Sequence, residues 1–468
     1  MSLEGVVGTL DTDVCIVGAG AAGLTLAHAL RKSGLSVLVL ESGPVDDPDG
    51  WNAGEVVGHP YNGLLRGRVR GLGGTTAVWP GQCMRLRPTD LAAWPFDLEP
   101  HYRRAEELLG IPAGETARDP WTLRGERGPG FDPALIESAT SVFCRRRRLG
   151  SLPVGNARVL TGATATRVES GRVEVRDAAG RHAEVEAEAV VLAAGTIETL
   201  RLMLVSGIGG GDVGRTFEDH AFADAARVVG PPRVLQEMYG MRLQRRLRYS
   251  PKLLLAGADP GCMGAIVFRY SPTSAIESAL RLRQALRARR RPDTRDLAYA
   301  IRGVPDLAAA ALRLTRGREP APPPDEVRFL AIVEQRPNAA SRLGLSDELD
   351  PLGIPRARVE WRIGEDERTS VETFATVLDE ELRRTDAGSL EVEPWLADAE
   401  HWSGHAFDSF HPAGGARIGD VIGDNLHVHG LPDVYVCGAA AFPRAGCVNP
   451  TLTIVALALR LAEQLEAR

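Results

Sequence analysis

Three glycines and one glutamate near the N-terminus have the types and spacing needed to bind a dinucleotide. The run Gly18-Ala19-Gly20-Ala21-Ala22-Gly23 allows a tight turn and lets the backbone approach a pyrophosphate closely. Glu41 ends the next apolar run, where a carboxylate can accept hydrogen bonds from both ribose hydroxyls and disfavours a 2′-phosphate. A glycine-rich helix start can also serve close packing alone. The order of strand, glycine turn, helix and acidic residue favours dinucleotide binding. It does not distinguish NAD from FAD.

These residues must be positioned by a strand, a turn, a helix and a second strand. The apolar run Val14–Val17 precedes the glycines, Ala21–Arg31 has helical spacing, and Val37–Leu40 is again apolar. Such a βαβ unit points the positive end of its helix at the pyrophosphate. Farther along, the apolar run Ala189–Ala194 predicts a buried strand that ends at Gly195, followed by a helix over Thr196–Ser206.

A second glycine motif bears on the choice of cofactor. Residues Arg70–Arg87 read R-G-L-G-G-T-T-A-V-W-P-G-Q-C-M-R-L-R. This resembles the second glycine motif of the glucose-methanol-choline (GMC) oxidoreductases, FAD enzymes that oxidise alcohols, and above all their pyranose-oxidase-like and bacterial sugar-dehydrogenase branch. Blocks that agree with the same family, in family order, are Val190–Leu204, Val213–His220 and His411–Ala462. The middle of the chain carries only scattered likeness, such as Glu334-Gln335-Arg336-Pro337-Asn338.

The resemblance implies FAD as the cofactor and no metal. In pyranose-oxidase-like proteins a histidine in the glycine motif attaches FAD covalently, and this chain has Val78 before Trp79 there, so we expect noncovalent FAD. The residues expected at the cofactor are Gly18, Gly20, Ala21, Ala22, Gly23, Glu41, Ser42, Gly73, Gly74, Thr75, Thr76, Val78, Trp79, Ala165, Ala194, Gly195, Gly438, Ala439, Asn449, Pro450 and Thr451.

The resemblance assigns His411 as the catalytic base. In the family, the histidine of H-x-x-G-T-x-R-M-G lies beside flavin N5 and accepts the alcohol proton; here the run is His411-Pro412-Ala413-Gly414-Gly415-Ala416-Arg417-Ile418-Gly419. An imidazole with an ordinary pKa near 6.5 can take a hydroxyl proton at neutral pH while hydride leaves the same carbon. The alternative is a core histidine whose ring is satisfied by hydrogen bonds.

Asn449 stands at the family's second catalytic position, in Val448-Asn449-Pro450-Thr451. Its amide can donate to the alcohol oxygen, it can cap the helix expected over Thr451–Glu466, or it can do both. The N-terminus of that helix would then point at the flavin pyrimidine. Relatives often have histidine where Cys447 stands. We expect this thiol to be inert, because Arg444 is its one evident basic neighbour.

The predicted function is FAD-dependent oxidation of a CH–OH group in a sugar, polyol or sugar-containing natural product such as an aminoglycoside-like intermediate. The electron acceptor is oxygen or another redox carrier. The alternative is a flavin-binding tailoring protein that carries out a non-alcohol redox step or a redox-silent binding role. An NAD-linked dehydrogenase would explain neither the Gly71–Trp79 motif nor the C-terminal tail.

The expected fold is α/β with two domains. A Rossmann-like FAD-binding domain comprises residues 1–221 and 403–468, with an extended excursion around 45–155. Residues 222–402 form an inserted substrate-binding domain built on an antiparallel sheet with helices. Within it, Ser274–Arg316 is helical in pattern, and its arginine-rich part, residues 281–302, suggests either contact with a membrane or partner, or a solvated arm.

Composition excludes several classes of protein. The chain has 468 residues, 44% of them hydrophobic and 25% charged, as soluble globular proteins do. A net charge of -6 gives no basic surface for nucleic acid. The six cysteines lack a C-x-x-C spacing, and no leader or membrane span of about 20 apolar residues is present. We therefore expect a reduced, cytoplasmic protein without zinc, whose oligomeric state the sequence leaves open.

Overall fold

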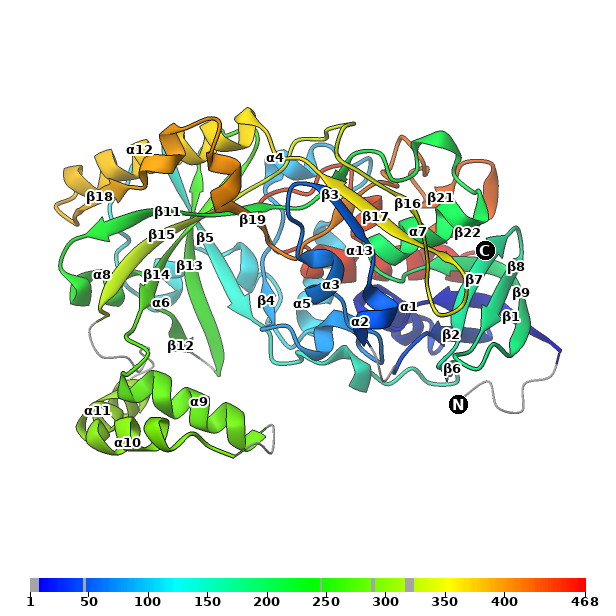
Figure 1. The fold of residues 1–468 in the computed structure, drawn as a ribbon, viewed down its shortest axis with the longest axis horizontal. Coiled ribbons are helices and arrows are strands. Elements are labelled where there is room, and N and C mark those ends of the chain that lie inside the picture. Colours follow the sequence, from blue (N-terminus) through cyan, green and yellow to red (C-terminus); the bar gives the residue numbers. More distant parts are fainter. Residues whose placement is uncertain (1–7, 45–47, 245, 288–290, 316–323) are drawn as a thin grey trace.

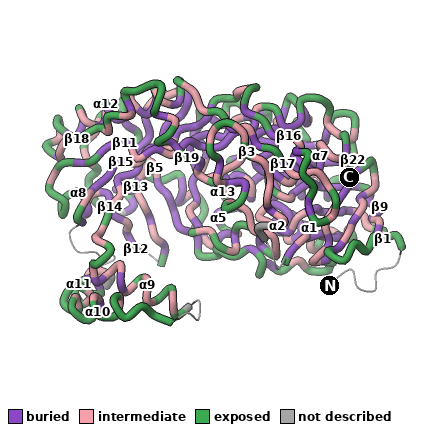
Figure 2. Tube along the Cα trace, viewed as in Figure 1, coloured by how far each residue is buried: buried purple, intermediate pink, exposed green. Residues whose placement is uncertain are grey.

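The computed structural model describes residues 8–44, 48–244, 246–287, 291–315 and 324–468. Two large sheets lie at opposite ends of the molecule in Figure 1, one built on parallel strands and the other antiparallel. The expected α/β fold, a Rossmann-like part with a second, antiparallel part, is confirmed. In Figure 2 the buried residues follow the strands of both sheets.

The first sheet has the strand order β21-β22-β9-β1-β2-β6 in the described part of the chain. Strands β22, β9, β1, β2 and β6 run parallel, and β7 and β8 extend the sheet through an antiparallel pairing with β9. The bounds are β1 Thr9–Val17, β2 Val37–Glu41, β6 Arg158–Thr161, β7 Thr164–Glu169, β8 Arg172–Arg176, β9 His182–Leu192, β21 His427–Val428 and β22 Leu431–Val436. The apolar run of β1 pairs with that of β2 from Val14 opposite Val37 onward, which buries both strands as the sequence predicts.

Three helices that start close to this sheet bear on the site, and a fourth packs on one of them. Helix α1 (Ala21–Leu30) and helix α13 (Thr451–Glu466) pack against each other, and α5 (Glu99–Leu108) packs on α13. Helix α7 (Thr196–Ser206) follows β9 and packs against a small sheet of β3 (Glu55–Gly58), β16 (Arg342–Leu349) and β17 (Pro355–Trp361). Each of α1, α7 and α13 begins where the sequence predicts.

The second sheet is antiparallel, with the order β18-β11-β15-β14-β13-β5-β4; in addition, β12 pairs with β13 and β19 pairs with β11. Helix α12 (Glu365–Arg384) packs on β11, β14, β15 and β18. The bounds are β4 Gln82–Cys83, β5 Ile136–Phe143, β11 Ala221–Val229, β12 Arg242–Gln244, β13 Leu247–Leu255, β14 Cys262–Arg269, β15 Glu326–Val333, β18 Ser389–Val392 and β19 Ala406–Asp408. Because β4, β5 and β19 come from outside residues 222–402, three parts of the chain build this sheet, and the domain boundaries stay a prediction.

Register in the second sheet brings three distant segments together. Ala221, the first residue of β11, pairs with Val333 at the end of β15 and with Asp408 at the end of β19. A short pairing of β10 (Phe217–Glu218) with β20 (Ala413–Gly414) continues this contact. Three segments therefore lie side by side at this end of the sheet: residues 217–220 before β11, 334–336 after β15 and 409–412 after β19.

Helices α9 (Ala275–Arg287), α10 (Thr294–Arg302) and α11 (Val304–Thr315) form an arm beside the second sheet (Figure 1). The predicted helical character of this segment is confirmed. Residues 288–290 and 316–323, which include Arg289 and Arg290 of the arginine-rich part, lie outside the described part. Within the described residues, none of the helices is both long enough and apolar enough to cross a bilayer.

Short helices complete the connections between these elements. Their bounds are α2 Pro48–Asn52, α3 Gly63–Arg66, η1 Gly74–Ala77, α4 Pro88–Leu91, η2 Glu115–Ala117, α6 Pro120–Arg124, η3 Leu149–Ser151, η4 Gly210–Asp212, α8 Pro232–Tyr239, η5 Pro394–Ala397, η6 Trp402–His405 and η7 Ala439–Ala441.

Candidate active site

A cavity of about 750 Å³ runs from the glycine turn after β1 to the residues that follow β19. Of the residues expected at the cofactor or in catalysis, all except Gly23 and Gly73 line it. Gly23 serves packing instead, because a Cβ there would lie 1.9 Å from the carbonyl oxygen of Gly18. Gly73 has a φ of +92° and opens the turn that carries Gly74 to the cavity wall.

Three helix N-termini meet at this cavity. Helices α1, α7 and α13 have the N-caps Gly20, Gly195 and Pro450, all three of which line the cavity, and no side chain caps any of them. An uncapped N-terminus presents free N–H groups and partial positive charge. Three such ends fit a long anionic ligand, and a flavin dinucleotide with its diphosphate is one.

Glu41 fixes the turn that faces the adenosine end of such a ligand. One carboxylate oxygen accepts from the amide of Ala19 at 2.9 Å, and the other accepts from Gly43 at 2.9 Å and Gly71 at 3.0 Å. Burial raises the pKa of this carboxyl, and these three amides oppose the rise. Glu41 therefore joins both glycine motifs and also lines the cavity where the sequence predicts the ribose.

The structure brings His411 and Asn449 together. Nδ2 of Asn449 lies 3.1 Å from Nε2 of His411, and both residues line the cavity. Since an amide NH₂ only donates, Nε2 carries the lone pair and the proton of a neutral ring lies on Nδ1. The capping alternative for Asn449 is wrong, because Pro450 is the N-cap of α13 and no side-chain hydrogen bond caps that helix.

His220 is a second histidine of the site that the sequence reasoning did not single out. Its Nδ1 lies 3.1 Å from Nδ1 of His411, so one of the two nitrogens must carry the proton and the other accept it. Burial lowers the pKa of His220 to about 4, and the ring also hydrogen-bonds to the backbone of Ala445. A neutral His220 can accept the Nδ1 proton of His411 and hold that ring in the tautomer whose Nε2 is unprotonated.

Asp219 binds the backbone on both sides of the histidine pair. It accepts from the amide of His220 at 2.7 Å and from the amide of His411 at 3.0 Å and 3.1 Å. It also accepts from the Tyr61 hydroxyl at 2.8 Å and from Ser409 Oγ at 3.2 Å. Burial raises the pKa of Asp219 to about 7, which the Tyr61 hydrogen bond opposes. Asp219 and His220 both lie in the block Val213–His220, whose likeness to the family was the signal in the sequence that could have identified them.

The wall next to His411 is largely apolar. Phe222, Ile332 and Phe410 line the cavity there. Phe410 directly precedes the histidine, is 46% exposed and has a φ of +61°, a strained value for a bulky residue. An aromatic ring held in this way at the cavity offers a flat surface to a ring-shaped substrate.

Burial lowers the pKa of His411 well below its ordinary value, and His220 lowers it further. If His411 acts as the base, its neutral ring is the active form, so the rate of flavin reduction should hold at neutral pH and fall only as the pH drops through this lowered pKa. We expect the acid limb of that rate to lie below pH 6.5, the ordinary histidine value. Anaerobic stopped-flow measurements between about pH 5 and 9 test this, and a midpoint at or above the ordinary value would contradict it.

Cys447 is fully buried, and burial raises its thiol pKa well above the usual value. A protonated, inaccessible thiol is a poor nucleophile, which supports the expectation that it is inert. All six cysteines are free and buried. Among the described residues, no group of three or more His, Cys, Asp or Glu side chains could hold a metal ion.

Comparisons with known proteins place the chain among flavoenzymes. A model described as FAD dependent oxidoreductase matches residues 13–120, and models described as GMC oxidoreductase match residues 147–222 and 337–458. The fructose dehydrogenase large subunit of Gluconobacter japonicus is 24% identical, over 97% of this chain and 98% of that protein. Paromamine 6'-oxidase of Streptomyces fradiae is 25% identical, over 96% and 90% respectively.

Solved structures share the fold. Pyridoxine 4-oxidase from Mesorbium loti has a TM-score of 0.56 at 18% identity and covers 97% of this chain and 99% of its own. Formate oxidase has a TM-score of 0.59 at 15% identity, with coverage of 98% and 99%. At these identities the likeness concerns architecture.

Proposed function

The chain belongs to the GMC oxidoreductase family, and from this membership we propose that it oxidises a CH–OH group of a sugar-type substrate with FAD as the hydride acceptor. The observation that carries the proposal is the pairing of His411 Nε2 with Asn449 Nδ2 at 3.1 Å, inside the cavity on which three helix N-termini converge. The proposed base, His411 Nε2, and the proposed hydrogen-bond donor, Asn449 Nδ2, thereby lie together in the cavity.

An alcohol oxygen placed between the two groups would replace their hydrogen bond: it would accept from Asn449 Nδ2 and donate its proton to the Nε2 lone pair of His411. When bound, FAD would supply the two-electron acceptor for the hydride of the carbinol carbon, which would leave a carbonyl. His411 is suited to the proton because its lowered pKa keeps it neutral at physiological pH. His220 and Ser409 hold the opposite side of the ring. Nδ1 of His411 lies 3.1 Å from Nδ1 of His220 and 3.0 Å from Oγ of Ser409.

The substrate class is supported by the wall and by the relatives. Phe222, Ile332 and Phe410 offer an apolar surface against which a pyranose face can pack, and Arg66 and Asp408 line the same cavity as polar groups. Among the relatives, the names fructose dehydrogenase, paromamine 6'-oxidase and 6'''-hydroxyparomomycin C oxidase all denote sugars or aminoglycosides. We propose a sugar, polyol or aminoglycoside-like intermediate of natural product biosynthesis, oxidised in the cytoplasm with oxygen or another redox carrier as the final acceptor.

The test is the flavin spectrum followed by an anaerobic substrate screen. We expect purified protein to be yellow, to release FAD on denaturation, and to be bleached without oxygen by at least one member of a panel of sugars, polyols and aminocyclitols. Oxygen and dye acceptors then separate an oxidase from a dehydrogenase. FAD that stays attached to the denatured chain would contradict noncovalent binding, and a flavin that no alcohol reduces would favour the alternative of a flavin-binding protein with another task.

A further inference from the structure

We propose that Glu334 and Gln335 are positioning residues that together fix the separation of His411 and Asn449. Both follow the last residue of β15 and neither lines the cavity. The inference rests on the proposed function, because it concerns the base and the donor of that reaction. It adds a role for two buried residues that touch neither substrate nor cofactor.

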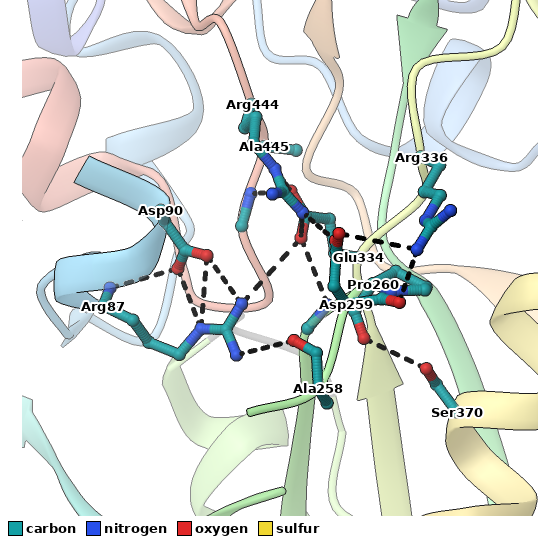
Figure 3. Close-up of polar contacts among 12 residues, drawn as sticks. Arg87, Asp90, Ala258, Asp259, Pro260, Glu334, Arg336, Ser370, Arg444 and Ala445 are labelled. Carbon is teal, nitrogen blue, oxygen red and sulfur yellow. Dashed lines mark hydrogen bonds and ion pairs between the residues drawn. The ribbon is translucent and has the colours of Figure 1, made fainter. Parts of the chain in front are cut away.

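Glu334 holds the loop that carries Asn449. It is 0% exposed, and its carboxylate accepts from the amide of Gly446 at 3.1 Å and from Arg444 at 3.0 Å and 2.7 Å. On the sheet side it accepts from the amide of Gly261 at 3.2 Å, and Arg87 lies 4.0 Å away. Figure 3 shows Glu334 between Arg444 on one side and the Ala258–Pro260 turn on the other. One carboxylate thus ties the 444–446 loop to the antiparallel sheet.

Gln335 holds the segments that carry the two histidines. It is 1% exposed, and its Oε1 accepts from the amide of Asp219 at 3.1 Å and from Trp361 Nε1 at 2.8 Å. Its Nε2 donates to the carbonyl of Arg362 at 2.6 Å. Asp219 in turn binds the amide of His411. Only Asp219 therefore lies between the side-chain amide of Gln335 and the backbone of His411.

The two side chains reach different loops because neighbouring residues of an extended chain point in opposite directions. The register of Ala221 with Val333 and with Asp408 brings the 217–220 and 409–412 segments beside them. Stability alone is a weak reason for Glu334, since a buried ion pair recovers little more than the cost of desolvating its charges. The buried carboxylate of Glu334 instead has a use if it helps to hold the loop of Asn449 at a fixed distance from His411.

The experiment compares Glu334→Gln and Gln335→Leu in the FAD-loaded protein. Each variant should bind FAD and substrate much as the parent does, and each should reduce its flavin about 10- to 100-fold more slowly at saturating alcohol, because small misplacements of catalytic groups lower kcat strongly. Glu106→Gln is the matched control. Glu106 is also a fully buried carboxylate, paired with Arg85 at 3.0 Å and with the amides of Gly114 and Thr116, away from the cavity. It should lose stability and keep the parent rate.

A double-mutant cycle separates positioning from general loosening. If Glu334 acts through Asn449, adding Glu334→Gln to Asn449→Ala should slow flavin reduction by no more than roughly 2-fold further. Gln335→Leu should keep most of its effect in that background, because it acts through His411. Equal losses in both backgrounds for Glu334→Gln, or parent rates in both single variants, would overturn the inference.

A readout that does not depend on turnover keeps the inference separate from the proposed function. Crystal structures of the two FAD-loaded variants should show that the His411–Asn449 hydrogen bond is lost, and the Glu106→Gln structure should retain it. If the bond persists in both variants, the positioning role is wrong, whatever the substrate. If the bond is lost but no alcohol reduces the parent, the proposed function fails and the positioning role stands.

Discussion

Replacing His411 with alanine is expected to slow anaerobic flavin reduction by about 10³- to 10⁴-fold while FAD stays bound. General base catalysis contributes up to about 10⁴-fold, and His411 is the titratable group whose unprotonated Nε2 faces the donor Asn449. The cofactor should remain, because the helix N-termini and Glu41 that face it belong to other segments. The measurement is stopped-flow bleaching with an alcohol that reduces the parent.

His429→Ala is the control, because His429 is an exposed histidine in the same C-terminal region that does not line the cavity. It should be reduced at the parent rate. The His411→Ala variant should also lose the acid limb of the parent, because the limb reports the protonation of that ring. Reduction of His411→Ala at the parent rate would show that another group takes the proton.

Gly20→Ala is expected to weaken FAD binding by about 100-fold without disturbing the fold. A Cβ at Gly20 would meet no protein atom within 4 Å, and Gly20 lines the cavity at the N-cap of α1. The methyl group would therefore occupy space that a bound pyrophosphate needs. Overpacking of this kind costs roughly 3 kcal/mol, or about 100-fold in FAD affinity. The ratio of flavin to protein after purification, and titration of the apoprotein with FAD, measure the loss.

Two other glycines separate binding from folding. Gly344→Ala places its Cβ in equally open space outside the cavity and should load FAD as the parent does. Gly23→Ala forces its Cβ to 1.9 Å from the Gly18 carbonyl oxygen, so this variant should lose stability as well as FAD. If Gly20→Ala loads FAD normally, the pyrophosphate does not lie against this turn.

The βαβ unit and the cavity lining were predictable because their signals are local. Val14–Val17, the glycines and Ala21–Arg31 specify strand, turn and helix within about 20 residues. The second glycine motif and the tail then located residues that do line the cavity. Gly23 and Gly73 do not line the cavity themselves, and they shape the backbone of the turns that carry its glycine wall.

His220, Asp219 and Gln335 could not be assigned from sequence, because their roles depend on strand register. The pairing of Ala221 with both Val333 and Asp408 joins segments more than 100 residues apart, and no local pattern fixes such a register. The antiparallel sheet was expected within residues 222–402, but β5 and β19 also belong to it. Strand β5 lies in the excursion around 45–155, more than 100 residues before its partner β13, and β19 is only three residues long, so neither reveals its partner by local periodicity.

The convergence of α1, α7 and α13 on one cavity also bears on how the protein is made. Three positive helix ends that face a common space repel one another, and a bound dianionic diphosphate supplies the opposite charge. A ligand that binds only the folded chain stabilises it by mass action. We therefore expect bound flavin to stabilise the newly folded chain in addition to accepting electrons.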